Sequence, residues 1–275
     1  MPTLSVEPNE RVTFRVCHED EDLLIVEKPS GLVTQPGVGH LTDTLLNGLF
    51  AVYGTQLQNL GNARDFGLVH RLDRETSGLL AVALTRRGYD GLRAQFEKRT
   101  TRKFYWAVCK AAPSRERGVI RIPIAERVER ASRYTSTKTA RIGAGGKPAL
   151  TAYRVLQEGR PISLIEARPV TGRLHQVRVH LDAIGATVLG DPVYGPKLAR
   201  ELSPRLALHA HRLCVTHPAT GKPIDVRTKW PRDLRNLLRK HGLERPDLAP
   251  APDEPEDLEV TDGPEISGDA DGAQG

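Results

Sequence analysis

Short apolar-rich runs recur along most of the chain, and several of them alternate between apolar and polar residues. Six of them have the length and the content of branched and aromatic side chains that β-strands favour: 23–27, 79–85, 103–109, 151–156, 162–167 and 206–216. Helical periodicity is less frequent and occurs at 43–53, 87–99, 173–184 and 231–241. Strands that outnumber helices without strict alternation predict an α+β fold with a large mixed sheet, not a doubly wound parallel one.

The ends and faces of the predicted helices carry further signals. Thr42 or Asp43 is the expected N-cap of the helix at 43–53, and Pro231 suits a first helical turn. The helix at 173–184 has an apolar stripe formed by Leu174, Val177, Leu181 and Ile184. Arg178 lies off this stripe, where it can face a polar site. The segment 111–150 is rich in Arg, Ser, Thr and Gly, which predicts an extended, mobile excursion over the surface.

Charge is distributed unevenly along the chain, whose net charge is +6. Residues 247–275 contain ten acidic residues and no Lys or Arg, so residues 1–246 hold 40 basic and 24 acidic residues, a net charge of +16. We therefore divide the chain into a folded body, 1–246, and an acidic tail, 247–275, whose composition predicts disorder. The basic body indicates a polyanionic partner such as nucleic acid, although a merely basic surface would have the same charge.

The cysteines and the apolar runs indicate the compartment. Cys17, Cys109 and Cys214 are far apart and odd in number, which is typical of a reducing environment and not of a disulfide framework. The opening MPTLSVEPNE has neither the basic nor the apolar region of a signal peptide, and no apolar run approaches the roughly 20 residues of a membrane helix. These features predict a soluble, cytoplasmic protein that does not associate with membranes.

Residues 64–80, RDFGLVHRLDRETSGLL, place a DFG beside a sequence close to HRD. A protein kinase has its DFG after the catalytic loop, its catalytic aspartate directly after the arginine, and a glycine-rich loop upstream. Here the DFG comes first, Leu72 separates Arg71 from Asp73, and no G-x-G-x-x-G precedes them. The GK at 146–147 also lacks the rest of a P-loop. The pattern argues against phosphoryl transfer.

Asp73 itself lies between two arginines, just before a Thr-Ser-Gly turn that leads into the apolar strand LLAVALT. Such a junction can present a carboxylate to a substrate while the backbone stays fixed. Nearby guanidinium groups would keep the carboxylate ionised and able to act as a nucleophile or a base. A purely structural ion pair with Arg71 or Arg74 explains the same residues equally well.

The segment 209–217, HAHRLCVTH, is dense in potential metal ligands. Strand alternation sends His209, His211 and His217 to one face and Cys214 to the other, so the four do not converge. A structural or RNA-facing strand is the favoured interpretation. A metal-dependent hydrolase that uses these histidines remains an alternative.

Several stretches carry a resemblance to a known family, and they occur in that family's order. They are HEDEDLLIVEKPSGLVTQPG, HRLDRETSGLL, KFYWAV, TGRLHQVRVHL, GDPVYG and LALHAHRLCVTHPATGK. Through them the sequence resembles the RluA family of pseudouridine synthases from about residue 14 to about residue 230. The resemblance implies one catalytic domain of two packed halves around a long mixed, mainly antiparallel sheet, with the active-site cleft between the halves. It also implies that the N-terminal S4 domain of many relatives is missing.

The resemblance assigns roles residue by residue. Asp73 matches the catalytic aspartate, Tyr105 the tyrosine that stacks on the target base, and Arg178 the arginine that pairs with the aspartate. Leu208, or less surely Leu206, matches the apolar residue of the uracil pocket. The flanking polar residues are expected to bind substrate: His70, Arg71, Arg74, Arg173 and His175. Leu174 and Ala81 depart mildly from the family's pattern, which affects fine positioning only.

The reaction implied is the isomerisation of uridine in RNA to pseudouridine: the N1–C1′ bond breaks, the uracil turns, and C5 joins the sugar. A carboxylate suits this chemistry because it can attack or stabilise an electron-poor anomeric carbon. The resemblance implies neither a cofactor nor a metal. The expected partner is a structured ribosomal or transfer RNA, and the enzyme is expected to be a monomer. A non-catalytic RNA-binding protein on the same scaffold is the second hypothesis.

Overall fold

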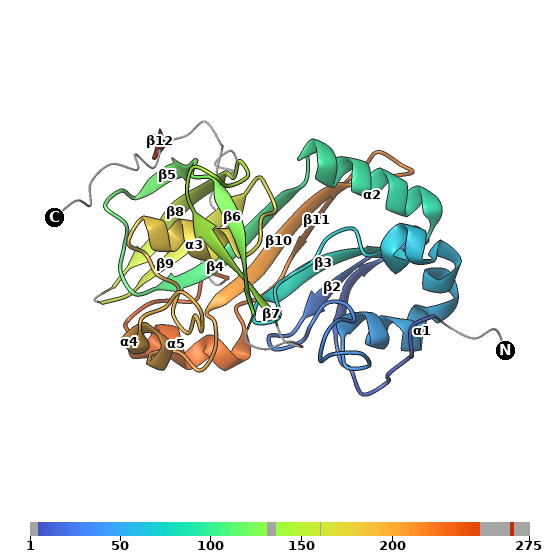
Figure 1. Cartoon of the computed structure of the whole chain (residues 1–275), viewed down its shortest axis with the longest axis horizontal. Helices are drawn as coiled ribbons and strands as arrows, with labels where there is room; N and C mark the ends of the chain where they lie inside the picture. Colours follow the sequence, from blue (N-terminus) through green and yellow to red (C-terminus); the bar gives the residue numbers. More distant parts are fainter. Residues whose placement is uncertain (1–4, 131–135, 160, 248–264, 267–275) are drawn as a thin grey trace. The chain divides into compact units, whose positions relative to one another are not determined.

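The structure is a computed structural model that describes residues 5–130, 136–159, 161–247 and 265–266 (Figure 1). The chain forms two compact units. Unit 1 comprises Met1–Lys103 and Ala210–Thr228, and unit 2 comprises Phe104–His209 and Lys229–Gly275. Each unit is therefore built from segments that are distant in the sequence, and each is described separately below.

Unit 1 contains an antiparallel sheet whose strand order is β1-β2-β3-β10, with β11 paired to β10. The strands are β1 (Arg15–Glu19), β2 (Leu23–Lys28), β3 (Ser77–Ala83), β10 (Leu208–Thr216, from Ala210 on in this unit) and β11 (Pro223–Arg227). The predictions at 23–27, 79–85 and 206–216 are confirmed. Strands β1 and β11 were not predicted, because both are short and largely polar. Each is an edge strand that pairs with one neighbour, β1 with β2 and β11 with β10.

The helices of unit 1 are α1 (Leu45–Leu60), the short 3₁₀ helix η1 (Asn62–Gly67) and α2 (Arg86–Lys98). The N-cap of α1 is Thr44, so the prediction of Thr42 or Asp43 is wrong. Thr44 forms a reciprocal capping box with Asn47, whose Oδ1 accepts the Thr44 N–H at 3.0 Å. Asp43 is used differently, because its carboxylate lies 2.7 Å from Nδ1 of His40. Helix α2 begins one residue from its predicted start.

One face of the unit 1 sheet packs against α2. The strand residues Leu23, Ile25 and Leu79 form a core with Tyr89 and Leu92 of the helix, and all of them are buried. Burying each side chain of this size contributes about 1.5–3 kcal/mol. Strands β2 and β3 are buried along almost their whole length. The loop that follows β2 and the loop that precedes β3 are therefore anchored to a rigid sheet.

Unit 2 contains a second set of strands in the order β4-β9-β8-β5-β12. Neighbours are antiparallel except for β12, which runs parallel to β5. The strands are β4 (Arg102–Cys109, from Phe104 on in this unit), β9 (Ser163–Pro169), β8 (Thr151–Glu158), β5 (Arg117–Ile120) and β12 (Glu265–Ile266). The predictions at 103–109, 151–156 and 162–167 are confirmed, and so is the α+β class with a mainly antiparallel sheet.

The segment 111–150 was predicted as an extended, mobile excursion, with no strand predicted in it; strands are present, and the mobility stays a prediction. It forms β5 and then an antiparallel hairpin of β6 (Ile124–Arg130) and β7 (Ser136–Ile142). Val119, Ile120 and Ile124 are buried. The many polar residues between these few apolar ones concealed the strands, because alternation in a two-stranded hairpin needs only one apolar face.

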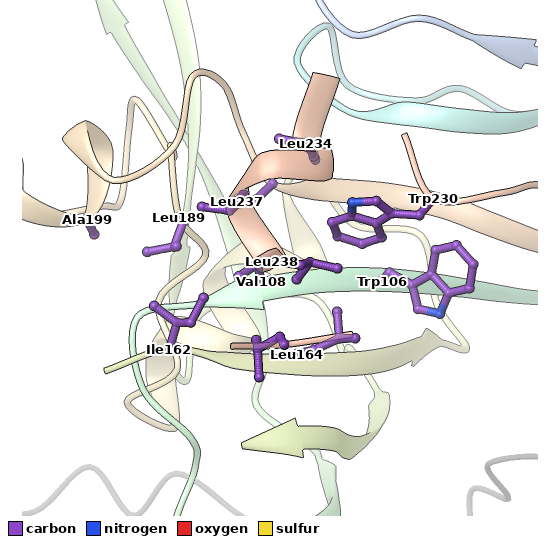
Figure 2. Packing of buried hydrophobic residues seen from close by; sticks show 12 residues of the cluster. Trp106, Val108, Ile162, Leu164, Leu189, Ala199, Trp230, Leu234, Leu237 and Leu238 are labelled. Atoms are coloured by element: carbon purple, nitrogen blue, oxygen red, sulfur yellow. The ribbon is translucent and has the colours of Figure 1, made fainter. Parts of the chain in front are cut away.

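Helices in unit 2 are shorter than predicted. They are α3 (Gln176–Ala183), α4 (Lys197–Glu201), the 3₁₀ helix η2 (Arg232–Leu234) and α5 (Arg235–Lys240). Helix α3 starts three residues after the predicted start because His175 has a left-handed φ of 52°. The predicted helix at 231–241 is divided between η2 and α5. A core of Trp106, Val108 and Leu164 packs against Trp230 and Leu238 (Figure 2).

The prediction of a disordered tail falls mostly on 248–264 and 267–275, which lie outside the described residues. Residues 265–266 of the tail are described and form β12 beside β5. The domain boundary near residue 246 remains a prediction. No helix in the described ranges is long and apolar enough to span a membrane.

Candidate active site

Asp73 lies in an extended loop between η1 and β3, and its side chain is half-buried. Its backbone carbonyl accepts a hydrogen bond from the Thr76 N–H at 3.2 Å, which closes a turn over Arg74 and Glu75. The turn was predicted at Thr-Ser-Gly, and this position is wrong, because Ser77 and Gly78 already belong to β3. The carboxylate is thus held close to the start of a buried strand.

A second segment, residues 28–34, donates hydrogen bonds to backbone carbonyl groups of the Asp73 loop. The buried Lys28 ammonium donates to the carbonyl oxygens of Pro29, Leu32 and Arg74 at 2.9, 2.7 and 3.1 Å. Thr34 donates its hydroxyl to the Leu72 carbonyl at 2.8 Å. Carbonyls on both sides of Asp73 therefore have fixed partners. A buried ammonium is stable only with such a set of acceptors.

Two further bonds complete the clasp formed by residues 28–34. Ser30 donates its hydroxyl to the Glu75 carbonyl at 2.6 Å, and the Gly31 N–H donates to the Arg74 carbonyl at 2.8 Å. Sequence reasoning did not single out Lys28. The signal that could have found it is its position: a lysine directly after the apolar strand LLIVE and directly before Pro-Ser-Gly. A lysine that is merely solvated has no obvious role at such a position.

Gly78, the second residue of β3, has to be a glycine. Its φ is +121°, and a Cβ built there would lie 2.2 Å from the Ala210 carbonyl oxygen. Only glycine allows β3 to approach β10 so closely. The position of the Asp73 loop relative to the unit 1 sheet therefore depends on this residue.

His70 was predicted to bind substrate, and the structure shows that it also has a structural role. Its Nε2 accepts the Ala81 N–H at 2.9 Å, and its ring stacks on Phe96 with centroids 4.4 Å apart. Burial, together with the positive charge of Lys103, lowers the pKa of His70 to about 3. The imidazole is therefore neutral near pH 7, and a neutral Nε2 is what the Ala81 N–H requires.

The two arginines beside Asp73 are exposed, and the DFG aspartate has its own partner. Arg74 donates from Nε to the Gly31 carbonyl at 3.3 Å, and Arg71 lies at the surface. Asp65 has a φ of 46° and accepts the Tyr89 hydroxyl at 3.1 Å. Asp65 and Phe66 thus form a left-handed corner before β3, which explains the DFG without any phosphoryl chemistry.

In unit 2, Tyr105 lies on β4 opposite Ala167 of β9, and 9% of its surface is exposed. Leu206 and Leu208 are both buried at 1% and 3% exposed. Burial suits an apolar role for the leucines but does not choose between them, and the stacking role of Tyr105 stays a prediction.

Arg178 is buried in α3 and forms a two-pronged ion pair with Asp191. Its Nε and Nη2 donate to Oδ2 and Oδ1 of Asp191, each at 2.7 Å, and the two side chains are only 3% and 1% exposed. Burial alone would raise the pKa of Asp191, but the hydrogen bonds and the charge of Arg178 outweigh it and lower this pKa. Asp191 also accepts the Val193 and Tyr194 N–H groups at 2.9 and 3.0 Å.

The GDPVYG sequence, residues 190–195, was part of the family resemblance, but no role was predicted for its aspartate, Asp191. Gly190 has a φ of +70°, and a Cβ there would lie 1.9 Å from the Arg205 carbonyl oxygen. The glycine lets the loop turn inward, so that Asp191 faces α3. Two of the five guanidinium N–H donors of Arg178 are used by this carboxylate.

The turn before α3 is held by Gln176 of the HQVR sequence. Its Oε1 accepts from the Thr171 hydroxyl at 2.7 Å and from the Arg173 N–H at 3.0 Å, and its Nε2 donates to the Leu150 carbonyl at 2.9 Å. Arg173 donates to the Pro148 carbonyl at 3.1 Å. His175 has its Nδ1 2.7 Å from the Tyr194 hydroxyl. His175 and Arg178 are thus brought together around the GDPVYG loop.

The histidine-rich strand β10 and the turn after it show separate contacts. His209 stacks near Trp106, with centroids 6.2 Å apart, and Cys214 lies with its Sγ 3.5 Å from Asp225. Nδ1 of His217 accepts the N–H groups of Ala219 and Thr220, both at 3.1 Å. Within the described ranges no three His, Cys, Asp or Glu side chains are grouped so as to hold a metal ion.

Comparison with known proteins agrees with this arrangement. The family model described as RNA pseudouridylate synthase matches residues 22–183, which include Asp73, Tyr105 and Arg178. The chain belongs to the RNA pseudouridine synthases. The resemblance to the RluA family is thereby confirmed, and the protein is an enzyme that isomerises uridine in RNA to pseudouridine.

Named relatives of this synthase cover most of its length. A ribosomal large subunit pseudouridine synthase D of Zymomonas mobilis is 39% identical over 236 residues, which are 83% of this chain and 73% of the relative. An uncharacterised RNA pseudouridine synthase of Bacillus subtilis is 38% identical and covers 85% of this chain and 75% of its own. The solved human RNA pseudouridylate synthase domain containing 4 has a TM-score of 0.64 at 26% identity, over 84% of this chain and 94% of that one.

Proposed function

We propose that this synthase acts on uridine in large-subunit ribosomal RNA with Asp73 as its catalytic carboxylate. The observation that carries the proposal is the clasp of residues 28–34, which binds the backbone on both sides of Asp73 and leaves its side chain half-buried. A nucleophile or electrostatic stabiliser must be held within a fraction of an ångström of its productive position, and rigid backbone on both sides favours this. Relatives named for the large ribosomal subunit support the choice of RNA.

Tyr105 and Arg178 complete the proposed catalytic group. The tyrosine ring would stack on the flipped uracil, because an extruded base loses its neighbours and an aromatic face restores part of that energy. Its hydroxyl is a candidate to move a proton late in the reaction. Arg178 would pair with the Asp73 carboxylate, as the family resemblance implies, and its ion pair with Asp191 fixes the plane of the guanidinium. Leu208 would contact the apolar edge of the uracil.

The substrate-binding group contains residues with two different kinds of environment. Arg71 and Arg74 are exposed and suited to contact phosphates, which dominate the affinity of proteins for nucleic acids. His70, Arg173 and His175 already donate to or accept from protein groups, so their contribution would be to hold the loops that receive RNA. We propose that the enzyme acts as a cytoplasmic monomer, and its three free cysteines are consistent with a reducing compartment.

The test is the isosteric change Asp73→Asn, measured as pseudouridine formed in an unmodified transcript of large-subunit ribosomal RNA. We expect the variant to fold and to bind RNA with unchanged affinity but to form no detectable pseudouridine, because only the charge is lost. Asp65→Asn is the matched control in the same stretch. It replaces one oxygen of an exposed carboxylate that accepts the Tyr89 hydroxyl, and it should leave turnover near the wild-type rate.

Three results would change the proposal. Appreciable turnover by Asp73→Asn would remove Asp73 from the central role. An inactive Asp65→Asn beside an active Asp73→Asn would transfer the role to Asp65. Wild-type enzyme that modifies transfer RNA but not ribosomal RNA would replace the substrate and leave the chemistry in place.

A further inference from the structure

Tyr194, the tyrosine of GDPVYG, contacts both strand β7 and helix α3 of unit 2, the latter at its N-cap and at Arg178. Its hydroxyl accepts the Ala140 N–H of β7 at 2.7 Å and lies 2.7 Å from Nδ1 of His175. Its ring lies under Arg178, whose guanidinium carbon is 4.9 Å from the ring centroid. The hydroxyl oxygen accepts from Ala140, and it can also donate its proton to Nδ1 in the tautomer of His175 that carries no proton on that nitrogen. A single side chain therefore links the β6–β7 hairpin to the arginine of α3.

The guanidinium of Arg178 is held on two sides by one short loop. Asp191 binds its edge at 2.7 Å, and Tyr194 covers its face at a distance typical of a cation–π contact. The Tyr194 N–H also donates to Asp191 at 3.0 Å, so the ring and the carboxylate move together. A displacement of the Tyr194 hydroxyl would therefore tilt the guanidinium plane.

The β6–β7 hairpin has a packed end and a charged surface. Ile124 and Ala140 pack on Val179 of α3, with Tyr194 against the same cluster. Lys138 and Arg141, in contrast, are exposed. The sequence 124–142 holds five basic and two acidic residues. An exposed basic hairpin is suited to the phosphates of an RNA substrate.

We propose that Tyr194 is a positioning residue that couples the β6–β7 hairpin to Arg178, so that RNA held by the hairpin sets the orientation of the arginine. This inference rests on the proposed function, which makes Arg178 part of the catalytic group. RNA phosphates on Lys138 and Arg141 pull on β7, and the Ala140–Tyr194 hydrogen bond transmits that change to the ring beneath the guanidinium. The hairpin thus contributes to the rate as well as to affinity.

The test is a double-mutant cycle in the full-length enzyme. Tyr194→Phe keeps the ring and deletes the hydroxyl, and the double variant Lys138→Gln/Arg141→Gln removes hairpin charge. The single-turnover rate at saturating ribosomal RNA transcript and the RNA Kd are measured for the wild type, each variant and the combination. We expect each variant alone to slow the reaction on the order of tenfold and the combination to be no slower than Tyr194→Phe. The charge variant should weaken Kd equally in both backgrounds.

The coupling would be overturned by a combination slowed by the product of the two effects, or by a charge variant that changes Kd alone. A lower melting temperature of Tyr194→Phe with an unchanged rate would give Tyr194 a structural role only, and would also overturn it. The control is Tyr53→Phe, which deletes a buried hydroxyl that donates to Glu19 at 3.1 Å in unit 1 and should not change the rate.

A spectroscopic readout separates this inference from the proposed function. In the Asp73→Asn background, where no turnover is expected, the ¹⁵N–¹H resonance of Arg178 Nε reports on its bond to Asp191. We expect RNA binding to shift this resonance when Tyr194 is present and to leave it unchanged in Tyr194→Phe. Equal shifts in both proteins would refute the coupling, whereas wild-type enzyme without turnover on ribosomal RNA would refute only the choice of substrate.

Discussion

Removing one partner of the buried pair of Arg178 and Asp191 should strongly destabilise unit 2. Asp191→Asn replaces one carboxylate oxygen by an NH₂ group that faces the guanidinium, so a charge that is 3% exposed loses its counterion. Removing one partner of a buried ion pair typically costs about 3–5 kcal/mol. In a protein of this size each kcal/mol lowers the melting temperature by roughly 2–4 °C, so the expected fall is about 6–20 °C.

The assay compares thermal unfolding of Asp191→Asn with that of Asp233→Asn, a matched pair at the surface. Asp233 also takes two hydrogen bonds from one arginine, with Nε and Nη2 of Arg205 at 2.5 and 3.1 Å, but its side chain is 56% exposed. Exposed pairs of this kind contribute about 0–1 kcal/mol. Equal melting temperatures for the two variants would refute the reasoning, because burial is the feature that distinguishes them. A milder Asp191→Asn effect together with lost catalysis would show that the guanidinium has reoriented toward solvent.

Two other changes test the support of the Asp73 loop. The free energy of unfolding should fall as the pH drops from 6.5 toward 3, by up to about 1.4 kcal/mol per pH unit for His70. In this range His70 binds a proton in the unfolded chain but not in the folded protein, where its pKa is about 3. Urea unfolding at pH 7 and pH 5 measures this, and a His70→Gln variant with an equally steep fall would contradict it. Gly78→Ala should cost more than about 3 kcal/mol or prevent folding, because its Cβ would lie 2.2 Å from the Ala210 carbonyl oxygen. Gly221→Ala is the control, since Gly221 also has a left-handed φ, +69°, but no atom lies within 4 Å of the position its Cβ would take. A similar loss of stability in both variants would show that backbone strain alone is responsible.

Local sequence was sufficient for the elements whose pattern is decided by burial. The apolar runs that became β2, β3, β4 and β9 were predictable, because a strand buried on both faces admits few polar side chains. The stretch HRLDRETSGLL identified Asp73 as a carboxylate at a loop-strand junction, and a turn follows it, although over Arg74 and Glu75 and not at Thr-Ser-Gly. The α+β class and the family could both be read from the chain alone.

The remaining features depend on contacts between residues that are distant in sequence. The predicted start of α3 was wrong because the left-handed His175 is held by Tyr194, and the hairpin was missed because its apolar face is completed by Val179 of another element. Lys28 and Asp191 had no signal of function in their own neighbourhoods, since what defines them is the set of acceptors or donors that folding brings to them. Periodicity reports which side of a strand or helix is buried, whereas the partner of a buried charge is chosen only when two elements pack together.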